Sequence, residues 1–206
     1  MTLPGRPDHS APPHDPATLK EPTDAMLQLT PFTPHHYELL CSWFGTEKEL
    51  IQWGGWGLTY PLDAAQLDQM LAEGAGPKPA RLCWMVEATD GVPVGHAQLA
   101  LDWQNSIGRI ARVGLAPDKR GQRLAVPMLR LVLAQAFALE AIERVELNVF
   151  TWNRAAIRTY ETLGFVHEGV RRSSAKAGDE RWDTAMMGML RGDWEQTLTA
   201  GEFPPT

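Results

Sequence analysis

A short polar loop between two apolar stretches contains residues that could bind an anion. It reads Arg-Gly-Gln-Arg over residues 120–123 and leads into an apolar stretch that predicts a helix over residues 124–140. The first backbone N–H groups of a helix have no partner inside the helix, and the helix dipole is positive at that end. The pattern therefore predicts a phosphate site, in which Arg120 and Arg123 add positive charge and Gly121 allows close approach of the backbone.

A second pair of polar residues lies further along the chain, at a spacing that fits one face of a helix. Asn153 and Tyr160 are about two helical turns apart, so they lie on the same face, roughly 10 Å from each other along the axis. A face of that length could contact an extended ligand. The structural alternative is that Asn153 caps the helix, Gly164 ends it, and Tyr160 is a core residue.

Together the two segments resemble the GNAT superfamily, the acyl-coenzyme A dependent N-acyltransferases. Residues 120–125 resemble its R/Q-x-x-G-x-G/A signature. Residues 148–169 resemble its other signature, in which an asparagine opens a helix, a tyrosine follows, and Leu-Gly-Phe closes it. One position departs, because Arg123 stands where the family has its second glycine. Arg123 must therefore turn outward or contact a phosphate itself. The resemblance covers about residues 26–195.

The resemblance implies that acetyl-coenzyme A is the co-substrate, and it gives roles to residues of both segments. Backbone groups of Val113, Gly114 and Leu115 would pair with the pantetheine arm and polarise the thioester carbonyl. Asn153 would orient this arm or a water, and Tyr160 would protonate the departing thiolate. The pyrophosphate would bind at the start of the helix, on Arg120, Gly121, Gln122, Arg123, Leu124 and Ala125.

The resemblance also implies that the amine attacks the thioester directly, and neither Cys41 nor Cys83 lies in a recognisable nucleophile context. The base stays open between Glu146 and a water relay. The acceptor stays open between a peptide or protein N-terminus and a small amine such as an antibiotic or polyamine. Trp53 and Trp56 are candidate substrate-binding residues, or else core residues. An acidic pocket around them would favour a small polycation, and an open groove would favour a peptide end.

We therefore expect an N-acetyltransferase that transfers the acetyl group of acetyl-coenzyme A to a primary amine in a ternary complex. The alternative, kept open by Arg123, is a non-catalytic acyl-coenzyme A sensor or regulatory module. Near the end of the chain, a few residues resemble the branch of the family that includes the ribosomal-protein alanine acetyltransferases. These residues are Glu168, Gly169, Val170, Arg171, Met189, Leu190 and Trp194.

The elements that position these residues follow from hydrophobic periodicity and turn residues. The strand, helix and strand over residues 109–149 indicate a parallel crossover, whereas residues 89–91 predict a hairpin. The glycine-containing segment 49–60 predicts a flexible loop. With the resemblance, we expect an α/β GNAT fold with a mixed, mostly antiparallel sheet of six or seven strands flanked by helices. Strands are predicted over residues 26–30, 82–88, 94–101, 109–115, 144–149, 165–171 and 181–190, and helices over residues 33–44, 63–73 and 124–140 and from Asn153.

Composition and charge limit which partners, location and metals can be expected for this protein. Because the net charge is −6, the chain is not expected to bind nucleic acid through phosphate neutralisation. No apolar run reaches membrane-spanning length and the first residues do not form a signal peptide, so we expect a soluble cytoplasmic protein without a membrane partner. The cysteines and histidines lack the spacing of metal ligands, so no metal is expected. A homodimer is one alternative for the oligomeric state.

The ends of the chain differ in composition from its centre. Residues 1–24 are rich in proline and poor in large apolar side chains, so burial cannot offset the entropy of ordering them. We expect a disordered tail there and a second one over residues 197–206. The N-acetyltransferase domain is then expected over residues 25–196.

Overall fold

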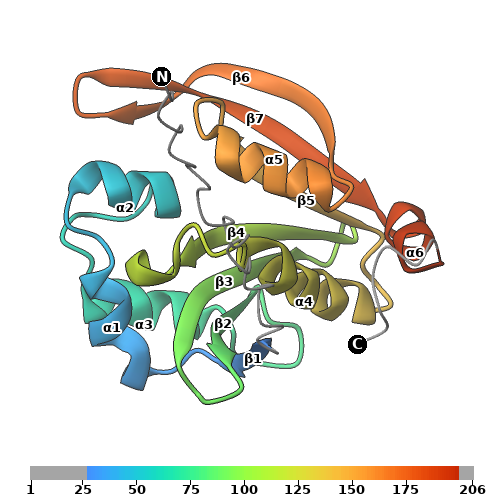
Figure 1. The fold of residues 1–206 in the computed structure, drawn as a ribbon, viewed down its shortest axis with the longest axis horizontal. Helices are drawn as coiled ribbons and strands as arrows, with labels where there is room; N and C mark the ends of the chain where they lie inside the picture. Colours follow the sequence, from blue (N-terminus) through green and yellow to red (C-terminus); the bar gives the residue numbers. More distant parts are fainter. Residues whose placement is uncertain (1–26, 200–206) are drawn as a thin grey trace, which may run out of the picture.

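Residues 27–199 of the chain are described by a computed structural model, in which helices cover both faces of a seven-stranded sheet (Figure 1). The strand order is β1-β2-β3-β4-β5-β7-β6. Neighbouring strands are antiparallel except β4 and β5, which are parallel. The predicted mixed, mostly antiparallel sheet is therefore confirmed. The strands are β1 Leu27–Pro31, β2 Arg81–Ala88, β3 Pro93–Asp102, β4 Ile107–Leu115, β5 Arg144–Phe150, β6 Val166–Ala177 and β7 Glu180–Leu190.

Helices connect the strands on both sides of the sheet. Helix α4 packs against β1, β3 and β4 and also contacts α5, whereas α2 contacts β4 and α3 contacts β2. Helix α4 is buried along one helical stripe, formed by Met128, Leu129, Val132, Leu133, Ala136 and Phe137. The helices are α1 Tyr37–Ser42, α2 Glu47–Gly54, α3 Ala64–Ala72, α4 Ala125–Ala138, α5 Arg154–Thr162 and α6 Arg191–Thr199, with 3-10 turns at Pro34–His36 and Pro117–Lys119.

Side-chain alternation along the strands divides the interior into two hydrophobic cores. Val86 of β2 belongs to the core that contains α4, whereas its neighbour Met85 belongs to the core formed with α1, α2 and α3. Successive residues of a strand point to opposite faces, so the two cores lie on opposite sides of the sheet. The sheet therefore holds α4 and the α1–α3 group on either side of the central strands.

The prediction of a flexible loop over residues 49–60 is wrong at its start, because α2 extends to Gly54. The Thr46 side chain accepts a hydrogen bond from the Glu49 N–H at 3.3 Å, and the Glu49 carboxylate accepts one from the Gly45 N–H at 2.8 Å. This reciprocal capping satisfies N–H groups at the helix start and stabilises a helix despite the glycines that follow it.

The end of the described chain is helical. Helix α6 lies outside the predicted elements, and its Trp194 ring stacks on Phe137 with ring centroids 5.9 Å apart. Both predicted tails lie outside the described residues, except that α6 extends to Thr199. Between residues 27 and 199, none of the helices has the length and apolarity required to traverse a bilayer.

A matched pair of substitutions tests this assignment of the core. Leu133 of α4 is fully buried, so Leu133→Ala is expected to lower the free energy of unfolding by about 2–5 kcal/mol through lost burial and a cavity. Leu39 of α1 is 38% exposed, and Leu39→Ala is expected to cost less than about 1 kcal/mol. Urea unfolding followed by tryptophan fluorescence measures both values. Equal losses in the two variants would contradict the assignment.

Candidate active site

Strand β4 contains one residue more than its neighbour β3 at the centre of the sheet. Between two register pairs, β3 contributes only Ala97, and β4 contributes Arg112 and Val113. Arg112 has a φ of 48°, in the left-handed region that a bulge can require. Ile110 and Val113, on either side of Arg112, both pack on the core that contains α4. The bulge therefore turns Arg112 toward the opposite face of the sheet.

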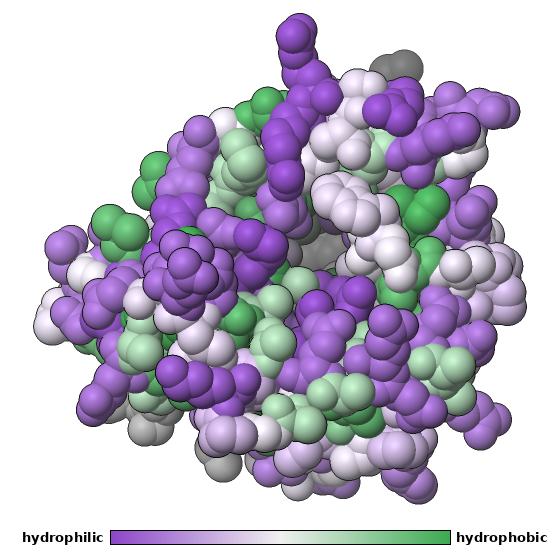
Figure 2. Space-filling model, turned by 180° about the vertical axis from the view of Figure 1, so that it is seen from behind, coloured by the Kyte–Doolittle hydropathy of each residue, from purple (hydrophilic) through white to green (hydrophobic). Residues whose placement is uncertain are grey.

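Strands β4 and β5 are paired over only part of their length. Their parallel register ends at the pair of Ile110 and Leu147. Beyond it the strands separate, and residues 111–115 and 148–150 line a cleft with a volume of about 830 Å³. In Figure 1, α2, α4 and α5 surround the place where β4 and β5 separate. On the face shown in Figure 2, a hollow near the centre is bordered mostly by hydrophilic side chains.

The loop before α4 presents unpaired backbone N–H groups at one end of this cleft. No described residue accepts a hydrogen bond from the N–H groups of residues 121–126. Gly121 has a φ of 77°, and a Cβ added there would meet nothing within 4 Å. Arg120 and Arg123 line the cleft beside these groups. Arg123 adopts a φ of 60°, in the left-handed region that favours glycine, and its side chain adds a cation to the cleft.

The structure brings together the residues expected to bind the cofactor, with one exception. Gln122 does not line the cleft, because its side-chain amide donates to the Asp118 carbonyl oxygen at 2.8 Å. This leaves only the backbone N–H of Gln122 for the predicted role. The residues that do line the cleft are Val113, Gly114, Leu115, Arg120, Gly121, Arg123, Leu124, Ala125, Asn153 and Tyr160.

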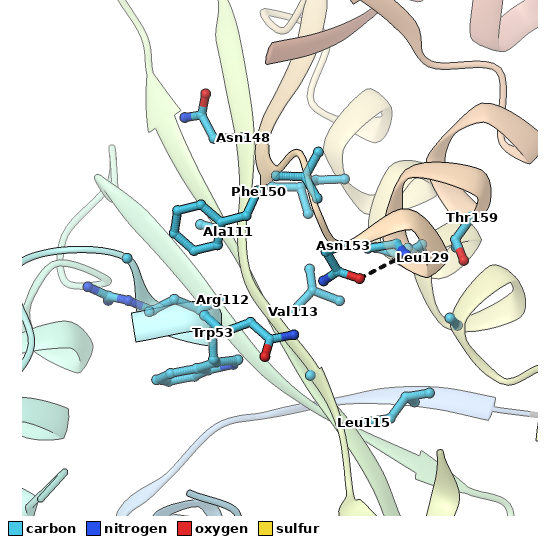
Figure 3. A pocket seen from close by; sticks show the side chains of 18 of the residues that line it. Trp53, Ala111, Arg112, Val113, Leu115, Leu129, Asn148, Phe150, Asn153 and Thr159 are labelled. Atoms are coloured by element: carbon cyan, nitrogen blue, oxygen red, sulfur yellow. Dashed lines mark hydrogen bonds between the residues drawn. The ribbon is translucent and has the colours of Figure 1, made fainter. Parts of the chain in front are cut away.

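Helix α5 places Asn153 and Tyr160 on the same wall of the cleft. Asn153 is the N-cap of α5: its Oδ1 accepts a hydrogen bond from the Ala156 N–H at 3.2 Å, drawn as a dashed line in Figure 3. Its amide N–H groups remain for a ligand. Tyr160 is 8% exposed, and burial raises the pKa of its phenol to about 12. The phenol therefore keeps its proton at neutral pH.

Helix α2 forms the wall of the cleft opposite α5. Trp53 is 8% exposed and lies against β4, since a Cβ added to Gly114 would be 3.1 Å from the indole ring. Phe44 packs on the same ring with centroids 4.8 Å apart. Trp53 is thus a core residue that also lines the cleft, whereas Trp56 is 66% exposed at its rim. The Trp53 Nε1–H is buried without a hydrogen-bond partner among the described residues.

Three arginines line the cleft on the side of the sheet that carries α1–α3: Arg81, Arg109 and Arg112. Arg81 is paired with Glu73 at 2.7 Å, and the Arg109 Nε donates to Glu146 at 2.8 Å. In Figure 3, Arg112 and Trp53 lie on one side of β4, and Asn153, Leu129 and Thr159 lie on the other. With Arg120 and Arg123, these residues give the cleft five cationic side chains, two of them paired with carboxylates, in a chain with a net charge of −6.

Arg112 differs from the other two arginines because no described carboxylate lies within 4 Å of it. Its Nη1 donates instead to the Gln98 Oε1 at 3.2 Å, and the same oxygen accepts from Arg81 at 3.0 Å. Burial, followed by the charge of Arg81, lowers the pKa of Arg112 to about 10. Arg112 is thus still a cation at neutral pH, and its nearest acceptor is a neutral amide.

Glu146, a candidate base, does not line the cleft. Its carboxylate accepts a hydrogen bond from Arg109 and lies 3.4 Å from the Nε of Arg144, which also pairs with Glu168. This ion-pair network holds Glu146 beside the sheet surface, so we assign it no role as a base. Among the described residues, Glu49 is the one carboxylate that lines the cleft, and it already accepts the capping hydrogen bond of Gly45.

His96 lies behind the cleft wall, where its ring packs against Trp53. It is fully buried, with its ring centroid 4.7 Å from that of Phe32 and 5.6 Å from that of Trp53. Burial, followed by the charge of Arg112, lowers the pKa of His96 to about 3. The imidazole is therefore neutral at physiological pH and has a structural role.

Sequence reasoning missed most residues on the α1–α3 side of the cleft. Their positions depend on the bulge in β4 and on the separation of β4 from β5, which are tertiary features. One signal was present: Ile110 and Val113 are both apolar but three residues apart, which strict strand alternation does not allow. The missed residues are Arg81, Ala100, Arg109, Arg112, Asn148, Phe150 and Thr184.

The cleft thus lies between two separating parallel strands, and its walls include the start of α4, with its unpaired N–H groups, and a buried phenol. In a comparison with known families, residues 37–165 match the model of the acetyltransferase (GNAT) family. The chain therefore belongs to the GNAT family and is an acetyl-coenzyme A dependent N-acetyltransferase.

Two relatives are similar in sequence to parts of this chain, and a solved structure has a similar fold. The L-amino acid N-acetyltransferase AaaT of Escherichia coli is 26% identical over 126 residues, which are 60% of this chain and 77% of the relative. An uncharacterized N-acetyltransferase of Bacillus subtilis, YokL, is 33% identical over 37% of this chain and 43% of its own. The spermidine N-acetyltransferase of Vibrio cholerae, solved with CoA and spermine, has a TM-score of 0.71 at 18% identity and covers 82% of this chain and 98% of its own. The resemblance to the ribosomal-protein branch stays a prediction.

The burial of His96 predicts a specific loss of stability in acid. The unfolded chain binds this proton below pH 6.5 and the folded chain only near pH 3, so protonation favours unfolding across this window. The free energy of unfolding is expected to fall by about 1.4 kcal/mol per pH unit between pH 6 and 4 through this group. Urea unfolding at several pH values should show a smaller slope for His96→Gln than for wild type.

The control for this experiment is His167→Gln, which replaces an exposed histidine of β6. It shows how far the loss of a histidine at the surface changes the dependence of unfolding free energy on pH. Parallel curves for His96→Gln and wild type would show that the buried imidazole does not cause the acid sensitivity.

Proposed function

We propose that this enzyme transfers the acetyl group of acetyl-coenzyme A to the primary amine of a small molecule, by direct attack within a ternary complex. Two relatives support a small acceptor: one acts by name on L-amino acids, and the V. cholerae structure holds spermine. The observation that carries the proposal is the cleft between β4 and β5, which joins the unpaired N–H groups before α4 to Tyr160.

The start of α4 fits the pyrophosphate of the co-substrate. The N–H groups of residues 121–126 have no described acceptor, and buried or ligand-facing backbone donors require one. The open space around Gly121 lets an anion approach the backbone, while Arg120 and Arg123 balance its charge. Both arginines and the helix dipole would favour binding of the diphosphate over that of a neutral group.

The free edge of β4 fits an extended arm that carries amides. Beyond Ile110, β4 has no hydrogen-bonded partner on its β5 side, so backbone groups of residues 113–115 on that side can pair with a ligand. Asn153 contributes amide donors from the start of α5. When bound, acetyl-coenzyme A supplies the thioester, and these groups would orient it.

Tyr160 would act as the general acid. The amine forms a bond to the acetyl carbon, the carbon–sulfur bond breaks, and the Tyr160 hydroxyl gives its proton to the departing sulfur. Because burial raises the pKa of Tyr160 to about 12, the hydroxyl is fully protonated before transfer. With Glu146 outside the cleft, the amine would lose its proton to water in the cleft.

The covering of the cleft supports a small acceptor over a peptide end. Helix α2 contacts β6, and Lys48 of α2 pairs with Glu180 of β7 at 2.6 Å. These contacts connect the helices on one side to the β6–β7 hairpin on the other. Such a connection would leave less room for a peptide, which needs an open groove, than for a small amine.

Removal of the Tyr160 hydroxyl tests the acid role. Tyr160→Phe is expected to lower kcat by about 10²–10⁴-fold, because the thiolate would leave without a positioned proton. The KM for acetyl-coenzyme A is expected to change little. Release of free thiol from acetyl-coenzyme A, measured with a panel of primary amines, gives both parameters.

Tyr37→Phe is the matched control, because the Tyr37 hydroxyl donates to Asp68 at 2.7 Å outside the cleft. This variant is expected to keep wild-type kcat. Unchanged turnover in Tyr160→Phe would show that Tyr160 is not the general acid. The absence of thiol release with every amine, despite tight coenzyme A binding by wild type, would contradict the proposed function itself.

A further inference from the structure

We propose that the acceptor is an amine that carries a carboxylate, such as a free amino acid, and that Arg112 binds this carboxylate. The inference rests on the proposed acetyl transfer and names the substrate class of the same cleft. It follows from where the bulge in β4 places a cation and from the lack of a described counter-ion for it.

The bulge determines which side of the sheet receives the Arg112 charge. Without the extra residue, alternation would direct Arg112 to the same face as Ile110, into the hydrophobic core that contains α4. With it, the side chain reaches Gln98, which is fully buried on the α1–α3 side. The bulge, with its strained backbone at φ 48°, thus places the guanidinium on the α1–α3 side of the cleft, where we propose that the acceptor binds.

No described carboxylate forms an ion pair with Arg112, although the charge of Glu73, beyond ion-pair distance from Arg112, partly offsets that of Arg81. Arg81 is balanced by Glu73 at 2.7 Å, and Arg109 is balanced by Glu146 at 2.8 Å. Gln98 accepts hydrogen bonds from both Arg81 and Arg112, but it carries no charge. A partly buried cation is costly unless an anion approaches it, so Arg112 favours a ligand with a negative group.

A carboxylate is the anion that best suits this site. The planar guanidinium matches a carboxylate in a bidentate arrangement, and Arg112 uses one described donor, Nη1, to reach Gln98. The acceptor must also carry an amine that reaches the cleft between β4 and β5. An amine and a carboxylate on one small molecule define the amino acids and related compounds. The unpaired Trp53 Nε1–H is a further donor in the same wall.

The same charges disfavour the other acceptor classes. A polyamine carries several positive charges, and Arg112, which forms no ion pair with a described carboxylate, lines the cleft and would repel them. The one described carboxylate in the lining, Glu49, is held by the capping of α2. A peptide N-terminus has an amide where a free amino acid has its carboxylate, so it would leave Arg112 unpaired.

Paired acceptors test the inference. Thiol release from acetyl-coenzyme A is measured with L-amino acids and with their α-carboxamides, which keep the amine and lose the negative charge. The ratio of kcat/KM for acid over carboxamide is expected to exceed 10 in wild type. In Arg112→Met this ratio is expected to fall by about 10–100-fold, because hydrogen bonds to a charged group are lost.

Two further variants sharpen the test. Arg112→Lys keeps the charge but loses the bidentate geometry, and its ratio is expected to lie between those of wild type and Arg112→Met. Arg158→Met is the matched control, because Arg158 is exposed on α5 and does not line the cleft. Its ratio is expected to equal that of wild type.

The outcomes separate this inference from the proposed function. If carboxamides or spermidine are acetylated as well as amino acids, or if the preference survives in Arg112→Met, the inference is overturned while acetyl transfer stands. If no amine is acetylated, calorimetry of amino acid binding to the coenzyme A complex decides. Binding by wild type that Arg112→Met loses would support the carboxylate site, and equal or absent binding would overturn it.

Discussion

The cleft exists because β4 and β5 stop pairing halfway along the sheet. Both strands continue, so their facing backbone groups need partners that the protein does not supply. The extra residue in β4 lies just beyond the last paired residue, Ile110, and adds the local twist and bend of a bulge at that point. A ligand arm can replace the missing strand contacts, so the separation becomes a binding site.

The cleft combines two electrostatic environments. At one end, the unpaired N–H groups before α4 and the arginines beside them suit a diphosphate. On the other side of the sheet, Arg112 stays charged although burial lowers its pKa, and Gln98 positions its guanidinium. Tyr160 also lines the cleft, and burial keeps its phenol neutral. The positive lining is local, since the chain as a whole is negatively charged.

Local patterns were enough to predict the strands, α4 and the Asn153–Tyr160 face, because each depends on periodicity or on neighbouring capping residues. Local patterns could not predict contacts between segments that are distant in the sequence. Glu146 was a candidate base until its partner Arg109, from the neighbouring strand, could be seen. Arg112 gave no functional signal, since its direction depends on the register between β3 and β4. Helix α2 was not predicted, because the glycines at its end favoured a loop, although Thr46 and Glu49 form its cap.

Amide hydrogen exchange with and without coenzyme A tests most directly whether the cleft between β4 and β5 binds the co-substrate. The N–H groups of residues 121–126 have no described acceptor in the free protein, so they should exchange quickly. Binding of coenzyme A should slow exchange of these amides and of those near the free edge of β4. Unchanged exchange at both places under saturating coenzyme A would show that the co-substrate binds elsewhere.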